Sequence, residues 1–228
     1  MKNIPRILDL RLPIHQSAFL WGARKTGKST YLKERFPESV VYDFLKTDLF
    51  LEMSKNPSLL REQLLAKEPA ALKKPIILDE VQKVPQLLDE VHWLIENKGL
   101  RFVLCGSSAR KLKLGHANLL GGRAWRYELF PLVSREISRF DLLRALNHGL
   151  IPFHYLQNDS DCRKSLEAYV QDYLRQEVFA EGLTRNIPAF LRFFDAFGYA
   201  HGEITNYTNI ARECGVDSKT VKEYYQIL

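Results

Sequence analysis

The sequence lacks any long uncharged apolar run, and it is poor in cysteine. No stretch approaches the ~20 apolar residues that a membrane-spanning helix needs, and the N-terminus has no apolar core of the kind found in secretory signals. The three cysteines are odd in number and far apart, so they form neither a disulfide framework nor a CxxC metal pair, and the six histidines show no metal-ligand spacing. We expect a cytoplasmic protein without membrane contact, with reduced, buried thiols at Cys105, Cys162 and Cys214.

The sequence also lacks internal repeats and low-complexity segments. The chain has no internal repeat and no long linker, and its 12 glycines and 10 prolines are too few for a collagen-like or low-complexity polymer. It has instead 46% hydrophobic and 11% aromatic residues over a length of 228, which is typical of a folded globular protein. That length allows one large domain, or one domain with a small appendage.

The formal net charge of +6 is concentrated in two segments. Residues 1–35 carry eight Lys or Arg against two acidic residues, and residues 101–126 carry six Lys or Arg and no acidic residue. The rest of the chain has a net charge of −6. Two local basic segments favour a compact anionic ligand over a nucleic acid that contacts the whole surface.

The order of apolar and helical patterns predicts an α/β fold in the first half of the chain. Short apolar runs alternate with amphipathic stretches, which is typical of a parallel sheet covered by helices. We predict strands at 17–21, 39–44, 75–79, 101–105 and 124–130, and helices near 28–36, 46–66 and 86–97. After Pro131 the spacing is helical, at 134–147, 161–180, 188–200 and, as two short helices, 203–228. We therefore predict a core domain over residues 1–145 and a helical region over residues 146–228.

The strongest motif is a complete G-x-x-x-x-G-K-[ST] phosphate loop at residues 22–29, between a strand pattern and a helix pattern. Its glycines let successive backbone N–H groups face one centre, and the helix N-terminus adds its positive dipole end. We expect Lys28 to contact the β- and γ-phosphates and the Ser29 hydroxyl to ligate Mg²⁺. The predicted nucleotide-binding residues are Gly22, Ala23, Arg24, Lys25, Thr26, Gly27, Lys28, Ser29 and Thr30.

A second motif is the apolar strand 75–79, which ends in the acids Asp79 and Glu80. We expect Asp79 to hold Mg²⁺ through the water shell of the metal, so the predicted metal residues are Ser29 and Asp79. Glu80 is predicted to orient and deprotonate the attacking water. Because kinases of small molecules do not need this second acid, the pair favours hydrolysis.

The strand at 101–105 is followed by Gly106, Ser107 and Ser108. Either serine is a candidate contact for the γ-phosphate or the attacking water, and a simple helix cap is the competing interpretation. Asn97-Lys98-Gly99-Leu100 contains only the first half of a guanine-binding Asn-Lys-x-Asp motif, so we predict ATP rather than GTP.

Arg123 follows two glycines in the second basic segment. It is a candidate to neutralise charge during phosphoryl transfer, in its own active site or in that of a neighbouring subunit. Arg110 and Arg126 are weaker candidates for the same role. The predicted catalytic residues are Glu80, Arg123, Ser107 and Ser108.

Segments throughout the chain resemble, in consistent order, the predicted bacterial and archaeal AAA-type P-loop ATPases that usually carry a C-terminal domain of unknown function, often nuclease-like. The resemblance implies an AAA-like core followed by a helical and winged-helix region, with ATP and Mg²⁺ as cofactors. It places Lys28, Ser29, Asp79 and Glu80 in ATP or metal roles and suggests Arg123 as a cis or trans arginine. The resembling segments are 22–29, 78–85, 105–110, 120–123, 128–132 with 135–136, and 169–178.

The C-terminal segment 210–221 has a helix–turn–helix pattern, with Gly215 at the turn and Ser218 capping the second helix. Residues 203–228 have a net charge of −1, and neutralisation of phosphates dominates DNA affinity, so we expect only weak DNA contact. The resemblance implies a wing and a further domain after Leu228, so we interpret the end as a truncated winged helix. It also implies a second sensor arginine, for which no clear candidate is found.

Together these features predict Mg²⁺-dependent ATP binding and hydrolysis that drives a conformational or oligomeric switch, with a second copy of the chain as a candidate partner. The alternative is a nucleotide-gated, DNA-associated regulator that binds ATP with little turnover.

Overall fold

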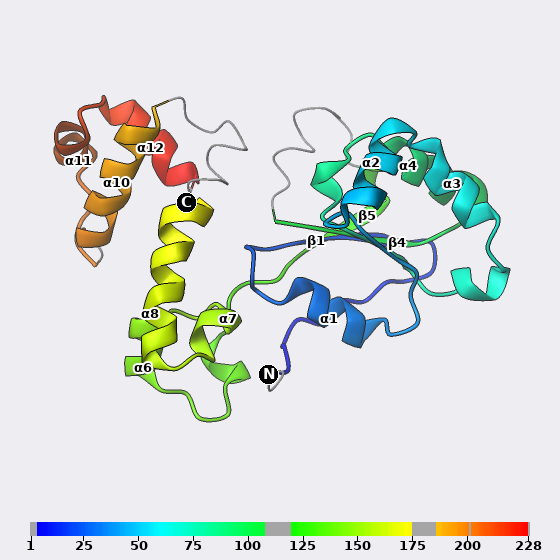
Figure 1. The fold of residues 1–228 in the computed structure, drawn as a ribbon, viewed down its shortest axis with the longest axis horizontal. Helices are drawn as coiled ribbons and strands as arrows, with labels where there is room; N and C mark the ends of the chain where they lie inside the picture. Colours follow the sequence, from blue (N-terminus) through cyan, green and yellow to red (C-terminus); the bar gives the residue numbers. More distant parts are fainter. Residues whose placement is uncertain (1–3, 108–119, 175–185, 201, 228) are drawn as a thin grey trace. The chain divides into compact units, whose positions relative to one another are not determined.

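The computed structural model describes residues 4–107, 120–174, 186–200 and 202–227. The chain divides into two compact units, residues 1–162 and 163–228 (Figure 1). The division at 162 differs from the predicted domain boundary at 145, which stays a prediction.

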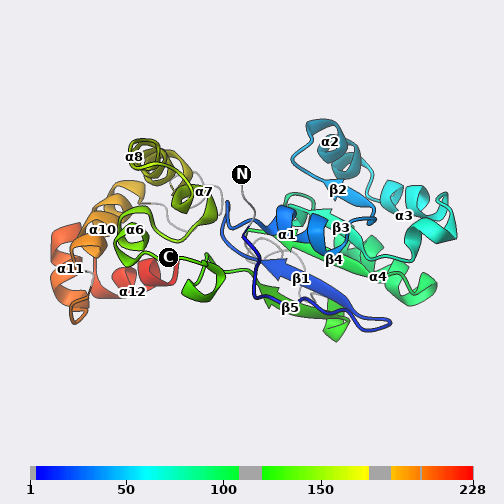
Figure 2. The same ribbon diagram turned by 90° about the horizontal axis from the view of Figure 1, so that it is seen from below.

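The first unit is built on a five-stranded, fully parallel sheet in the order β2-β3-β4-β1-β5 (Figure 2). Its strands are β1 (Ser17–Trp21), β2 (Val41–Asp43), β3 (Ile76–Asp79), β4 (Phe102–Gly106) and β5 (Ala124–Glu128). Every residue of β1, β3 and β4 is buried, as expected for strands covered on both faces. The predicted parallel sheet with flanking helices is confirmed.

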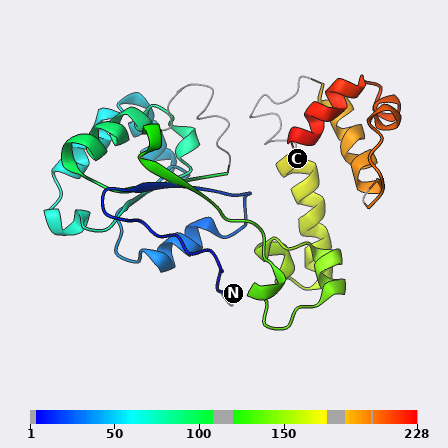
Figure 3. The ribbon, with the colours of Figure 1, turned by 180° about the vertical axis from the view of Figure 1, so that it is seen from behind.

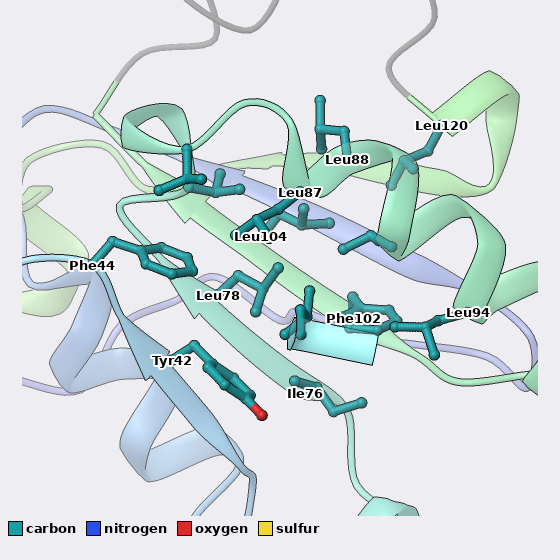
Figure 4. Close-up of a cluster of buried hydrophobic side chains, with 14 of the residues drawn as sticks. Tyr42, Phe44, Ile76, Leu78, Leu87, Leu88, Leu94, Phe102, Leu104 and Leu120 are labelled. Carbon is teal, nitrogen blue, oxygen red and sulfur yellow. The ribbon is translucent and has the colours of Figure 1, made fainter. Parts of the chain in front are cut away.

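Helices cover both faces of this sheet (Figures 1 and 3). On one face α2 (Thr47–Lys55), α3 (Ser58–Leu65) and α4 (Leu87–Lys98) enclose the larger core. In this core Phe102 of β4 lies beside Leu94 of α4, and Leu104 of β4 lies beside Leu87 (Figure 4). On the other face α1 (Lys28–Arg35) packs with Leu10 of the N-terminal segment against Ile77 and Val103. These two cores hold the carboxyl ends of β1, β3 and β4 in fixed register.

The single helix predicted over 46–66 is instead two helices, α2 and α3. Pro57 follows Asn56, and the residue before a proline is disfavoured in helical conformation, so α2 ends at Lys55. The helix predicted over 134–147 is likewise wrong at its start, because it begins as one short turn, η4 (Ser134–Glu136), before α6.

The rest of the first unit consists of short helical elements. They are η1 (Pro69–Leu72), η2 (Val81–Lys83), η3 (Leu120–Gly122), α6 (Leu142–His148), α7 (Pro152–Tyr155) and the start of α8 (Asp159–Ala168), which continues into the π-helical turn Tyr169–Leu174. Cys105, Cys162 and Cys214 are free and buried, which confirms their prediction. In the described part of the chain no helix has both the length and the apolar character of a membrane span.

The second unit contains α10 (Ile187–Tyr199), α11 (Tyr207–Cys214) and α12 (Ser218–Ile227). Phe190, Phe193 and Tyr224 meet in its own core. Gly215 ends α11 in the left-handed conformation (φ 67°), so the predicted glycine turn between two helices is present. The predicted cap at Ser218 is wrong: Ser218 is the first residue of α12, and the Asp217 side chain caps the helix by accepting from the Thr220 backbone N–H at 2.7 Å. The winged-helix assignment itself stays a prediction.

Candidate nucleotide-binding site

The phosphate loop lies between the end of β1 at Trp21 and the start of α1 at Lys28. Gly22 passes so close to the Leu129 carbonyl oxygen that a Cβ would lie 2.3 Å from it, and Gly27 has a φ of 91°. Both positions therefore need glycine, for close approach in one case and for left-handed backbone in the other. The loop ends at a helix N-terminus, which is the arrangement that binds phosphate.

Lys28 is 6% exposed, and its ammonium group is held over the loop. Nζ donates to the carbonyl oxygens of Gly22 at 2.7 Å and of Ala23 at 3.0 Å. The Thr26 hydroxyl closes the loop by donating to the same Ala23 oxygen at 2.8 Å. Among the residues that the structure describes, the Lys28 ammonium hydrogen-bonds only to neutral carbonyls, so a phosphate oxygen would give it a stronger, charged partner.

The Ser29 hydroxyl donates to Oδ2 of Asp79 at 2.6 Å, so the fold joins residues from α1 and the end of β3. Asp79 is 6% exposed. A hydroxyl and a carboxylate are hard oxygen donors that fit Mg²⁺, which keeps waters and takes phosphate oxygens for its remaining positions. No cluster of three or more His, Cys, Asp or Glu suited to a metal occurs among the described residues.

Glu80 lies beside this pair and is 8% exposed. Its backbone has a φ of 59° and a ψ of 40°, a left-handed conformation that is uncommon for a residue with a side chain. Glu80 borders a cavity of about 310 Å³ with six residues of the predicted nucleotide set. The lining is Arg24, Lys25, Gly27, Lys28, Ser29, Thr30, Leu45 and Glu80.

Gln82 is a residue of this site that the sequence analysis missed. Its Nε2 donates to Oε2 of Glu80 at 2.5 Å and to the Ser107 hydroxyl at 3.2 Å. The signal that could have found it is an amide two residues after the acid pair. Ser107 lies at the end of β4 near Glu80, whereas Ser108 and Arg110 lie outside the described residues.

A second cavity, of about 390 Å³, adjoins the other side of the phosphate loop. Lys25, Gly27 and Thr30 border both cavities. The Lys25 ammonium lies 4.0 Å from the centre of the Phe153 ring of α7, within cation–π range. Thr26 of the predicted nucleotide-binding set also lines this cavity. The other lining residues, which the sequence analysis did not predict, are Ile4, Arg6, Tyr31, Glu34, Leu132, Pro152 and Leu156.

Arg123 is not brought to the phosphate loop. It precedes β5, where its carbonyl oxygen accepts from the Ser17 backbone N–H at the amino end of β1, whereas the loop follows the carboxyl end of β1. Its guanidinium pairs with Glu96 of α4, which lowers the pKa of that carboxyl. Arg126 lies exposed on β5. This placement does not support the predicted role of Arg123 in its own site, and a role in a neighbouring subunit stays a prediction.

Cys105 lies next to Asp79 in the register of β3 and β4. Burial, together with the negative charge of Asp79, raises the pKa of the Cys105 thiol well above its usual value. The thiol is therefore neutral and unreactive at pH 7 and packs beside the site without adding charge to it.

A parallel sheet in the order β2-β3-β4-β1-β5, with a phosphate loop after β1 and an acid pair after β3, defines a P-loop nucleoside triphosphatase fold. Residues 15–138, more than half of the chain, match the family model described as AAA domain, so the chain belongs to the AAA domain family. Residues 139–228 match a domain of unknown function, DUF8612. The predicted AAA-type core is thereby confirmed, while the nuclease-like C-terminal domain stays a prediction.

One curated relative is the uncharacterized protein MJ1544 of Methanocaldococcus jannaschii, which is 25% identical over an alignment of 208 positions that covers 82% of this chain and 47% of that protein. The chain thus spans about half the length of this relative. Similar solved structures include the Walker-type ATPase PABY2304 of Pyrococcus abyssi (13% identity, 91% and 90% coverage of this and that chain, TM-score 0.42). Another is the replication initiator DnaA bound to AMPPCP and single-stranded DNA (14% identity, 93% and 82% coverage, TM-score 0.39). At such TM-scores, structural likeness supports no conclusion about function.

Proposed function

We propose that the protein binds ATP with Mg²⁺ and hydrolyses it, and that hydrolysis drives a conformational or oligomeric switch. One observation carries the proposal: Lys28, Ser29 and Glu80 border a single cavity, and the Ser29 hydroxyl donates to the carboxylate of the buried Asp79. Membership in the AAA domain family supports nucleotide binding at a general level.

In this proposal each residue at the phosphate loop has a separate task. The Lys28 ammonium exchanges the carbonyls of Gly22 and Ala23 for β- and γ-phosphate oxygens, and the loop N–H groups bind the same phosphates. Ser29 and Asp79 hold Mg²⁺, which neutralises charge on the phosphates when it is bound.

Glu80 acts on the nucleophile. A carboxylate oxygen of Glu80 takes a proton from water as the water oxygen attacks the γ-phosphorus in line. The bond from that phosphorus to the bridging oxygen breaks, and its electron pair leaves with ADP. The products are ADP and inorganic phosphate.

The second cavity is the proposed site of the nucleotide base. It shares Lys25, Gly27 and Thr30 with the phosphate cavity, so one ligand can extend from one cavity into the other. Its lining combines aromatic and aliphatic side chains, including Phe153, with a few polar groups, as ligand pockets usually do.

The Glu80→Gln variant tests hydrolysis. It keeps the size of the side chain but removes the proton acceptor, so we expect Mg²⁺-dependent phosphate release to fall by about 10²- to 10⁴-fold while fluorescent ATP-analogue binding stays within about twofold. Glu38→Gln, at a carboxylate that is 78% exposed and lines neither cavity, is the matched control and should keep the parent rate. No phosphate release by the parent protein, with or without DNA and at high protein concentration, would refute the ATPase proposal.

The alternative function, a nucleotide-gated DNA-associated regulator, is favoured by the helix–turn–helix geometry of α11 and α12. The segment 203–228, which contains both helices, has a net charge of −1, and this charge opposes strong contact with DNA phosphates. Phosphate release and DNA binding, each measured with duplex and with single-stranded DNA, distinguish the ATPase from the DNA-associated regulator. Tight ATP-dependent DNA binding without turnover would support the regulator.

A further inference from the structure

Gln82 connects two strands of the candidate site through one amide group. It lies in η2, two residues after Glu80, and is 7% exposed. Its Nε2 donates to Glu80, which follows β3, and to Ser107, which follows β4. Both partners are candidate catalytic residues, and the two strands that carry them are hydrogen-bonded neighbours.

The stability of the fold does not explain a glutamine at this position. Within the described part of the chain, Oε1 of Gln82 is buried and has no hydrogen-bond partner, which is unusual for a buried polar atom. An apolar side chain of similar size would avoid that cost. The chain even makes room for the amide, because a Cβ at Gly106 would lie 2.2 Å from Oε1.

The hydrogen bonds leave each partner with the group that hydrolysis needs. An ionised carboxylate only accepts hydrogen bonds, so the bond to Oε2 leaves Oε1 of Glu80 to take the proton of the attacking water. The Ser107 hydroxyl oxygen accepts from Gln82, so its own proton can be donated to a phosphate oxygen. One amide therefore sets the orientation of both groups.

We propose that Gln82 is a positioning residue that holds the Glu80 carboxylate and the Ser107 hydroxyl on one amide, and thereby links contact with the γ-phosphate to activation of water. The inference rests on the proposed ATPase function. Gln82 does not border the phosphate cavity and acts through its two partners.

Gln82→Leu and Gln82→Met test this role, since both remove the amide and keep most of the volume. We expect the turnover number to fall about tenfold or more, because small displacements of reacting groups have effects of that order. The ATP-over-ADP affinity ratio should fall several-fold, while the urea unfolding midpoint stays equal or rises. Gln86→Leu, at an exposed glutamine just before α4, is the matched control and should change none of the three.

A Ser107→Ala variant completes the test. If Gln82 acts through Ser107, each single variant lowers the ATP-over-ADP ratio and the double variant lowers it no further than the larger single effect. Unchanged turnover and an unchanged ratio in both Gln82 variants would overturn the inference and leave the ATPase proposal intact. If the parent binds ATP but releases no phosphate, the ATPase proposal fails, and the affinity ratio alone decides the role of Gln82.

Discussion

Glu80 combines burial with a left-handed backbone, which costs a residue with a side chain about 1–2 kcal/mol. Two hydrogen bonds hold the Glu80 backbone in this left-handed conformation. Its backbone N–H donates to Oδ1 of Asp79 at 3.1 Å, and its carboxylate accepts from Gln82. Strain of this kind persists where several contacts specify one conformation, and it occurs often at functional sites.

His154 is a buried imidazole in α7, and its ring contacts that of Phe153, which lines the second cavity. Burial is the main cause that lowers its pKa below the usual value, and the nearby charge of Lys25 lowers it further. The neutral form is therefore preferred in the folded protein. At a pH below the usual value near 6.5, the unfolded chain binds a proton that the folded chain does not.

The sign of the pH effect follows from this difference in bound protons. Above about pH 7, His154 is neutral in both the folded and the unfolded chain and does not lower the free energy of unfolding. As the pH falls from about 6.5 toward the lower folded pKa, the unfolded chain takes up a proton first, so the free energy of unfolding decreases. Urea unfolding of the parent at about pH 7.5 and about pH 5.5 should show lower stability at the acidic pH.

His154→Gln should reduce that pH-dependent difference, whatever its effect at neutral pH. His92→Gln, at an exposed histidine of α4, is the control and should keep the parent difference. An equal pH dependence in parent and His154→Gln protein would contradict the assignment.

At the scale of elements, the N-terminal segment is tied to the phosphate loop by a buried ion pair. Arg6 and Glu136 of η4 lie 3.0 Å apart with side chains 9% and 2% exposed. Arg6 also donates to the Thr26 carbonyl oxygen at 2.8 Å, and Glu136 accepts from the backbone N–H groups of Ile7 and Val133. One ion pair therefore connects η4, the N-terminal segment and the loop.

Glu136→Ala should lower the free energy of unfolding by about 3–5 kcal/mol, because it leaves the buried Arg6 charge without its partner. Urea denaturation measures this change. Glu38→Ala, at a carboxylate that is 78% exposed, should stay within about 0.5 kcal/mol of the parent. A Glu136 variant as stable as the parent would show that the pair only orients the segment.

The elements show where local patterns are sufficient. Continuous apolar runs identified β1, β3 and β4, since strands buried on both faces need no polar alternation. The strands β2 and β5, which are only partly buried, were also predicted. The break between α2 and α3 depends on Pro57, a local signal that the prediction of one long helix overlooked. The short η2 turn, with Gln82, had no periodicity by which to predict it.

At the scale of the whole molecule, the position of Arg123 makes its predicted role depend on a second copy. The loop and Arg123 lie at opposite ends of the five-residue strand β1, a separation of about 16 Å along the sheet. We therefore expect phosphate release per molecule to rise with protein concentration and to fall about 10³-fold or more in Arg123→Ala at high concentration.

Steady-state phosphate release over a wide range of protein concentration checks this prediction. Arg139→Ala, at an exposed arginine before α6, is the control. A rate per molecule that is independent of concentration, and equal in parent and Arg123→Ala protein, would exclude a role for Arg123 in catalysis.

The sequence by itself determined the parallel α/β core, the phosphate loop and the acid pair, because each depends on residues adjacent in the chain. The two basic segments illustrate the limit of such inference: Lys28 lies at the candidate site, whereas Arg123 lies at the other end of the sheet. Only the tertiary structure brought Ser29 to Asp79 and placed Gln82 between Glu80 and Ser107. Those contacts join residues from different strands and helices, and packing of the sheet and its helices, rather than spacing along the chain, decides which of them meet.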